Sequence, residues 1–269
     1  MASESIVSGM GRAVARPAVR RIGLGDVGDA LRRGFADFRA NPTHLVFLSL
    51  IYPIAGLLFG RIASGYNAVP LLYPLIGGFA LIGPIAAVGL YDFSRRRERG
   101  ESVSWRNAFD ILQSPRIGAI AVLAGMLVGL FALWLLAAQL IYNATLNGIG
   151  NESLPDLVRA TLYTPAGHTL LVVGTLVGFV FAVVALTIGV ISVPLLVDRD
   201  IATTPGEEAA VAVETSTRAV LLNIGPMIAW GLVVVAGLAI GVVTLLVGFA
   251  VIMPVLGHAT WHLYRKMVV

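Results

Sequence analysis

Long apolar runs alternate with short, arginine-rich polar segments along the chain. Each run is close to the roughly 20 residues that an α-helix needs to cross about 30 Å of hydrocarbon. The last run, 226–264, is too long for one crossing, because a helix over it would measure about 58 Å at about 1.5 Å per residue. We therefore place a tight turn near Gly241–Thr244. The pattern predicts an all-α membrane protein with six transmembrane helices, at about 44–63, 70–93, 117–142, 168–197, 226–240 and 245–264.

A polar segment with helical periodicity precedes every second run. From residue 26, apolar side chains recur on one helical face and charged ones on the other, as in a helix that lies at a membrane surface. The apolar face holds Val27, Ala30, Leu31, Phe35 and Phe38, and the charged face holds Arg32, Arg33, Asp37 and Arg39. Segments 105–113 and 207–222 have the same place before the third and fifth runs.

These lead-in segments divide the chain into three similar units. Each unit is an amphipathic helix followed by a two-span hairpin, and the units cover 26–93, 104–197 and 207–266. The similarity of Gly78–Pro84 to Gly248–Pro254 supports this division. Because every unit enters the membrane from the same side, we expect three parallel repeats within a single transmembrane domain, 26–266.

The composition favours a membrane protein, since 57% hydrophobic and 13% charged residues leave too little polar surface for a soluble one. With the N-terminus inside, every Lys and Arg except Arg61 and Arg159 falls on the cytoplasmic side. The positive-inside rule then predicts a multi-pass protein of the bacterial inner (cytoplasmic) membrane with both termini cytoplasmic. We expect this basic side to contact membrane lipids, and no nucleic acid. Residues 1–25, rich in Gly, Ala, Ser and Arg, are predicted to be a disordered basic tail.

Glycines four residues apart occur within or at the edge of four of the predicted spans. Such pairs let helix backbones approach closely where lipid supplies no hydrophobic drive. They could also mark the contact face of a homodimer, but we favour packing within one chain. The pairs are Gly56/Gly60, Gly125/Gly129, Gly174/Gly178 and Gly237/Gly241.

The centres of the six predicted spans contain no ionisable residue, which argues against a proton pump or an ion-coupled carrier. Candidate chemistry remains near the cytoplasmic ends, at His44, Asp92, His258 and His262. His258 and His262 are four residues apart, so one helix face could present both imidazoles to a metal ion. Asp92 would be the third ligand, and His44 could join them or hold a haem iron.

A structural interpretation of the same two histidines is the one we favour. Near the C-terminal end of a helix, His258 and His262 gain from the helix dipole. With Trp261 and Tyr264 they would then form an aromatic belt that anchors the helix at the membrane interface. Under this interpretation the protein needs no cofactor.

Motifs for common catalytic sites are absent. The sequence has no cysteine, no phosphate-binding loop of the GxxxxGK[ST] type, no HExxH, no GxSxG and no GxGxxG after a strand. No loop is long enough to bury a core of its own. A conventional soluble catalytic domain is therefore excluded, and we expect a protein that is not an enzyme.

Several stretches resemble a family of uncharacterised bacterial integral membrane proteins, DUF2189. They are Phe38–His44, Tyr52-Pro53, Gly78–Arg97 and the ending Pro254–Lys266. The resemblance implies an integral membrane architecture. It implies no reaction or ligand residue, because the family has no established activity.

Together these observations predict a non-catalytic structural, accessory or assembly component of the membrane, beside a respiratory or envelope complex. One alternative is a permease or lipid-handling protein that uses the proline-containing spans. Another is a metal- or haem-binding membrane protein that uses His44, His258 and His262.

Overall fold

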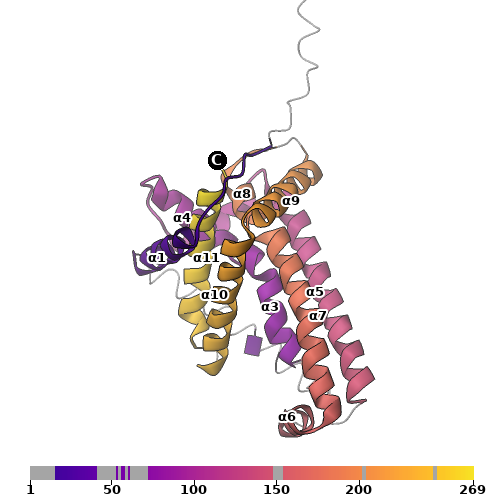
Figure 1. The fold of residues 1–269 in the computed structure, drawn as a ribbon. Helices are drawn as coiled ribbons and strands as arrows, with labels where there is room; N and C mark the ends of the chain where they lie inside the picture. The colour runs from indigo at the N-terminus through magenta and orange to yellow at the C-terminus, as the bar shows by residue number, and fades with distance from the viewer. Residues whose placement is uncertain are drawn as a thin grey trace, which may run out of the picture.

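The computed structural model describes residues 16–40, 53, 56–57, 60, 72–147, 154–201, 204–244 and 247–269 (Figure 1). Within these ranges the chain is helical apart from loops and one antiparallel bridge, between Val19 and Val268. The predicted first span, 44–63, and residues 1–15 of the predicted tail lie wholly or almost wholly outside them. The helices are α1 (Leu24–Ala40), α3 (Leu72–Ala86), α4 (Val88–Glu98), η3 (Trp105–Gln113), α5 (Ile117–Thr145), α6 (Leu154–Tyr163), α7 (Pro165–Gly189), α8 (Ser192–Asp198), α9 (Pro205–Leu222), α10 (Ile224–Val243) and α11 (Phe249–Met267).

Three stretches of the described chain are long and apolar enough to cross a membrane. They are α5, α7 together with α8, and α10, which coincide with the predicted third, fourth and fifth spans. Many of their apolar side chains face outward, as Leu133, Leu176 and Leu232 do. Such surface is unfavourable in water and suits hydrocarbon. The fold is therefore that of an integral membrane protein with transmembrane helices.

Two of the predicted spans are broken near their polar ends. The run 70–93 forms α3 and α4, separated at Ala87, which has φ −85° and ψ 1°. The run 168–197 forms α7 and α8, which are joined through Val190 and Ile191. At Ala87 the ψ angle departs from that of an α-helix, whereas Val190 and Ile191 keep φ and ψ in the right-handed helical region.

Glycines allow the apolar helices to approach one another. A Cβ on Gly178 of α7 would lie 2.9 Å from the Trp134 ring of α5, and one on Gly237 of α10 would lie 2.9 Å from Ile252 of α11. The predicted packing within one chain is therefore confirmed at these two helix pairs. The glycine pair predicted on α5 has no neighbour within 4 Å among the described residues.

The lead-in segments are helical, as predicted. Segment 105–113 forms the 3₁₀-helix η3, whose first turn is closed by reciprocal hydrogen bonds between Ser104 and Asn107. At the start of α9, the hydroxyl of Thr204 accepts a hydrogen bond from the backbone N–H of Glu207. Both starts satisfy N–H groups that a helix cannot satisfy internally.

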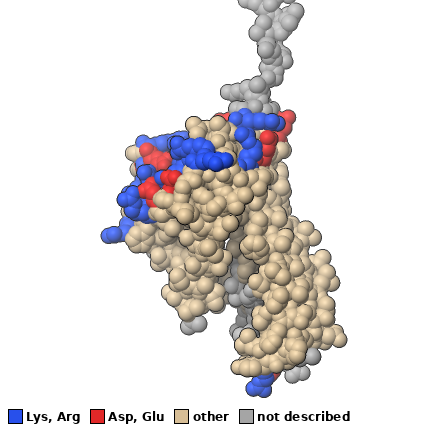
Figure 2. Space-filling model, in the orientation of Figure 1, with Lys and Arg blue, Asp and Glu red and all other residues tan. Residues whose placement is uncertain are grey.

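Charged side chains gather at one end of the molecule, over α1, α9 and the C-terminal end of α11 (Figures 1 and 2). We call this end the charged layer. The described N-terminal segment and the C-terminus meet in it, where Arg20 N donates to Met267 O and Val269 N to Ala18 O, both at 2.9 Å. The two ends of the described chain therefore lie on the same side, as the distribution of arginines predicts.

Candidate functional site

Helix α1 packs most extensively on α11, and a glycine permits this contact. A Cβ on Gly34 would lie 2.6 Å from the backbone nitrogen of Ala259, so the two helix backbones nearly touch. The buried face of α1 holds Val27, Ala30, Gly34 and Asp37. Asp37 therefore belongs to the buried face, whereas the sequence analysis placed it with the exposed charges. Phe35, predicted on the apolar face, is 47% exposed.

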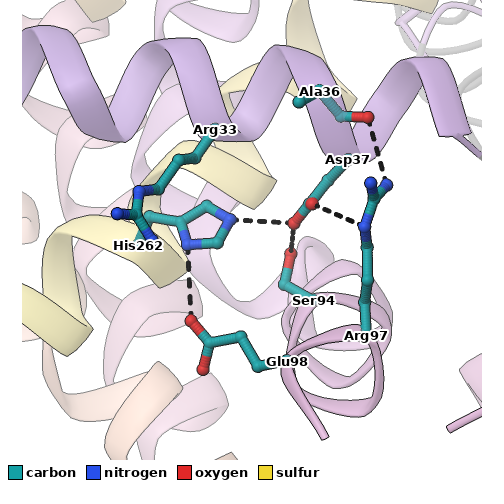
Figure 3. A pocket seen from close by; sticks show the side chains of 7 residues that line it. All are labelled: Arg33, Ala36, Asp37, Ser94, Arg97, Glu98 and His262. Carbon is teal, nitrogen blue, oxygen red and sulfur yellow. Dashed lines mark hydrogen bonds and ion pairs between the residues drawn. The ribbon is translucent and has the colours of Figure 1, made fainter. Parts of the chain in front are cut away.

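The buried carboxylate of Asp37 accepts hydrogen bonds from two other helices (Figure 3). Its Oδ2 atom accepts from the Ser94 hydroxyl of α4 at 2.7 Å and lies 2.9 Å from His262 Nε2 of α11. Its Oδ1 atom lies 3.3 Å from Nε of Arg97 in α4. Burial by itself raises the pKa of Asp37, but the hydrogen bonds from His262 and Ser94 and the neighbouring imidazoles outweigh it and keep that pKa below 3.8.

His258 joins this group through Ser94. Its Nδ1 lies 2.6 Å from the Ser94 oxygen, and 3.9 Å from Asp37 Oδ2. The single hydroxyl proton of Ser94 goes to Asp37, so Ser94 accepts the Nδ1 proton of His258. The Nε2 atom of His258 is then an acceptor, and it is buried without a partner within the described part of the chain.

Glu98 of α4 closes the group on the other side of His262. Its Oε1 lies 3.5 Å from His262 Nδ1, and its Oε2 lies 3.1 Å from Nε of Arg265. Both nitrogens of the His262 ring therefore face carboxylates, one from α1 and one from α4. We call Asp37, Ser94, Arg97, Glu98, His258 and His262 the Asp37 cluster. It links three helices that are far apart in sequence.

A second group of polar contacts joins α8 to the end of α11. The Tyr264 hydroxyl donates to Asp198 Oδ2 at 2.7 Å, and Arg265 Nη1 lies 3.2 Å from the same oxygen. These contacts fix the orientation of the last turn of α11.

Asn223, which precedes α10, holds the N-terminal segment. Its side-chain oxygen accepts from the backbone N–H of Ile22 at 2.8 Å, and its side-chain nitrogen donates to the carbonyl of Arg20 at 3.1 Å. It also donates to Ala219 O at 2.9 Å. This buried amide therefore positions the chain just before α1.

The structure does not bring Asp92, His258 and His262, the described members of the predicted metal site, together around one point. Asp92 hydrogen-bonds Arg95 and lies 2.6 Å from Nε of Arg96. Within the described ranges, no three His, Cys, Asp or Glu side chains are placed to hold a metal ion. His44 lies outside those ranges, so a metal or haem site with His44 stays a prediction.

The predicted aromatic belt is wrong. Trp261 and Tyr264 are fully buried within the protein, so neither ring reaches a membrane interface. The physical reason is that α1, α4 and α8 cover the C-terminal half of α11. His258 and His262 lie on one face, as their spacing predicts, and contact Asp37 and its neighbours there.

Four members of the cluster were missed from the sequence: Asp37, Ser94, Arg97 and Glu98. A local signal exists only for Asp37. It continues the spacing of Val27, Ala30 and Gly34 along one helical face. Ser94, Arg97 and Glu98 carry no comparable signal, because their partners lie in other helices.

The fold and the cluster define an integral membrane protein with transmembrane helices, in which α1, α4 and α11 share a buried polar cluster at one end. Residues 72–198 match a family described as a predicted integral membrane protein, DUF2189, which confirms the resemblance over α3 to α8. The ending 254–266 lies beyond the matched residues. Neither the curated proteins nor the solved structures that were searched gave a match.

Proposed function

We propose that this protein is a non-catalytic structural, accessory or assembly component of the bacterial inner membrane. The observation that carries the proposal is the Asp37 cluster, in which α1, α4 and α11 are joined by polar side chains that bind one another. Ser94 is buried, and its hydroxyl donates to Asp37 and faces His258 Nδ1, so it links α4 to both other helices. A group of this kind holds helices in place and needs neither a cofactor nor a substrate.

The proposal includes six spans and both termini in the cytoplasm. The apolar helices α3 and α11 would be the second and sixth spans, beside the three longer stretches. Support comes from the contact between the described N-terminal segment and the C-terminus, which fits an even number of crossings. The basic residues of the charged layer favour the cytoplasmic side.

We also propose that the chain is built from three parallel repeats. Helices α1, η3 and α9 each precede a predicted hairpin, and η3 and α9 each form an ion pair with another segment of the chain. For η3 the contact is an ion pair of 2.7 Å between Arg96 and Asp110. For α9 it includes Arg16 and Glu214, 3.6 Å apart.

Copurification tests the proposed role in a complex. The tagged protein is extracted from native membranes in mild detergent, and bound proteins are identified and quantified by mass spectrometry. We expect a defined set of respiratory or envelope proteins in stoichiometric amounts. An unrelated multi-span protein with the same tag and expression level is the control, and the proposal fails if both recover the same proteins or none.

The same preparation tests the absence of a resident metal or haem. We expect no stoichiometric metal and no visible absorption band. A band or a metal that disappears in the double variant H258A/H262A would show that the histidines bind a cofactor, and would replace this proposal with the ligand-binding alternative.

A further inference from the structure

Helix α6 lies at the end of α5 and α7 that is opposite the charged layer (Figure 1). Thr164, at φ −120° and ψ 150°, separates α6 from α7, so α6 leaves the line of that helix. The Thr164 hydroxyl donates to the carbonyl of Ala160 at 2.6 Å, and His168 Nε2 lies 2.9 Å from the carbonyl of Leu162. A Cβ on Gly167 would lie 2.2 Å from Ala160 O, so the two helices nearly touch. These contacts fix α6 against the first turn of α7.

One face of α6 is buried in the protein. Ala160 is 6% exposed and packs with Tyr142 and Leu146 of α5. Leu157 of α6 and Leu170 of α7 join the same apolar cluster. A helix that packs on protein alone needs apolar side chains along this face only.

A second side of α6 is apolar but exposed. Val158 and Leu162, four residues apart, share this side and are 46% and 50% exposed. Arg159 is exposed as well, and at about 100° per residue it lies beyond Val158 on the side away from Leu157. The helix therefore has a buried face, an exposed apolar flank formed by Val158 and Leu162, and a polar side. An apolar flank next to a polar side is typical of a helix that lies at a membrane interface.

The depth of α6 agrees with such a position. The residues that it packs against lie next to outward-facing side chains, since Leu140 of α5 is 59% exposed and Leu171 of α7 is 39% exposed. Helix α5 has 29 residues and is about 43 Å long at about 1.5 Å per residue. This length exceeds the roughly 30 Å of hydrocarbon and fits the roughly 40–45 Å of a bilayer with its headgroups. The lipid-facing surface of α5 and α7 therefore continues up to α6.

We propose that the exposed apolar flank of α6 is a membrane-docking surface. Val158 and Leu162 insert at the boundary between lipid chains and headgroups, and Arg159 lies among the headgroups. Tyr163, 79% exposed at the end of α6, combines an apolar ring with a polar hydroxyl, which suits the same boundary. The occupant of the flank is the bilayer that surrounds α5 and α7. The inference goes beyond the proposed function and holds whether or not the protein joins a complex.

The chain has no cysteine, so a single-cysteine variant carries one label without background. V158C and L162C place a nitroxide spin label on the apolar flank. R159C, on the same helix, is the matched control on the polar side. L176C replaces a leucine of α7 that is 63% exposed and gives the reference for lipid. D200C replaces an aspartate whose side chain is 77% exposed and gives the reference for water.

Each full-length variant is purified and reconstituted into vesicles of phosphatidylethanolamine and phosphatidylglycerol. Electron paramagnetic resonance measures collisions of the label with molecular oxygen, which concentrates in hydrocarbon, and with a nickel chelate, which stays in water. The same samples are diluted with unlabelled protein to reveal labels that lie close to a second copy of the chain. Thermal melting curves show that each variant is folded.

We expect the ratio of oxygen to nickel collisions at V158C and L162C to exceed the ratio at R159C severalfold and to approach that at L176C. Dilution should leave the spectra of V158C and L162C unchanged. A ratio at these two positions equal to that at D200C would place the flank in water and overturn the proposal. Protection from both reagents, with spectra that sharpen on dilution, would show that a second copy covers the flank, and would overturn it as well.

Discussion

Removal of the Asp37 carboxylate is expected to detach α1 from α4 and α11. In D37A, the Ser94 hydroxyl, the His262 ring and the Arg97 guanidinium all lose an acceptor. Two of these donors are buried, and loss of one partner from a buried charged pair typically costs about 3–5 kcal/mol. We expect a loss of this size in the free energy of unfolding.

The matched control is D29A, on the same helix. Asp29 binds the exposed Arg32 and Arg33, and it binds Lys266, which keeps Asp26 as a second partner. Exposed ion pairs contribute about 0–1 kcal/mol each because water and salt screen them. D29A therefore removes one negative charge, as D37A does, but we expect it to lower the free energy of unfolding much less.

Two measurements detect whether α1 has detached. Denaturant unfolding in detergent micelles, monitored by tryptophan fluorescence, gives the free energy of each variant, since Trp261 lies in the covered half of α11. Limited trypsin digestion without denaturant reports α1 itself, because Arg32 and Arg33 become cleavable when the helix leaves its site. Equal losses in D37A and D29A, with unchanged trypsin protection, would refute the role assigned to Asp37.

Three further outcomes follow from the same contacts. Replacing Gly34 by valine should lower the free energy of unfolding by at least about 1–3 kcal/mol, because the side chain overpacks against α11. Gly28→Ala, with no neighbour within 4 Å, should be neutral or stabilising by up to about 1 kcal/mol. Thermal melting curves compare the two variants, and equal behaviour would contradict the close helix contact. Asn223→Ala should cost about 1–3 kcal/mol and speed hydrogen exchange in residues 18–23, and unchanged exchange there would show that the amide does not hold that segment. The folded pKa of Asp37 is below its unfolded value of about 3.8, so its stabilising effect is present above that pH and is lost as the pH falls through the lower folded value. The difference in melting temperature between wild type and D37N should therefore narrow below pH 4. A constant difference would argue against an ionised Asp37.

The sequence was most informative about the apolar helices and the charged end. Three predicted spans coincide with described helices, because a run of about 20 apolar residues has few other solutions in a bilayer. The asymmetry of the arginines anticipated a single charged layer (Figure 2). The breaks at Ala87 and at 190–191 were not predicted, since hydropathy reports burial in lipid and not the direction of the chain.

The contacts of the cluster were less accessible to sequence reasoning. The i, i+4 spacing placed His258 and His262 on one face correctly, but the carboxylate assigned to them was Asp92. Asp92 has two arginines within its own helical turn, at positions 95 and 96, which satisfy it locally. Asp37 lies 225 residues before His262, and only the packing of α1 on α11 brings them together.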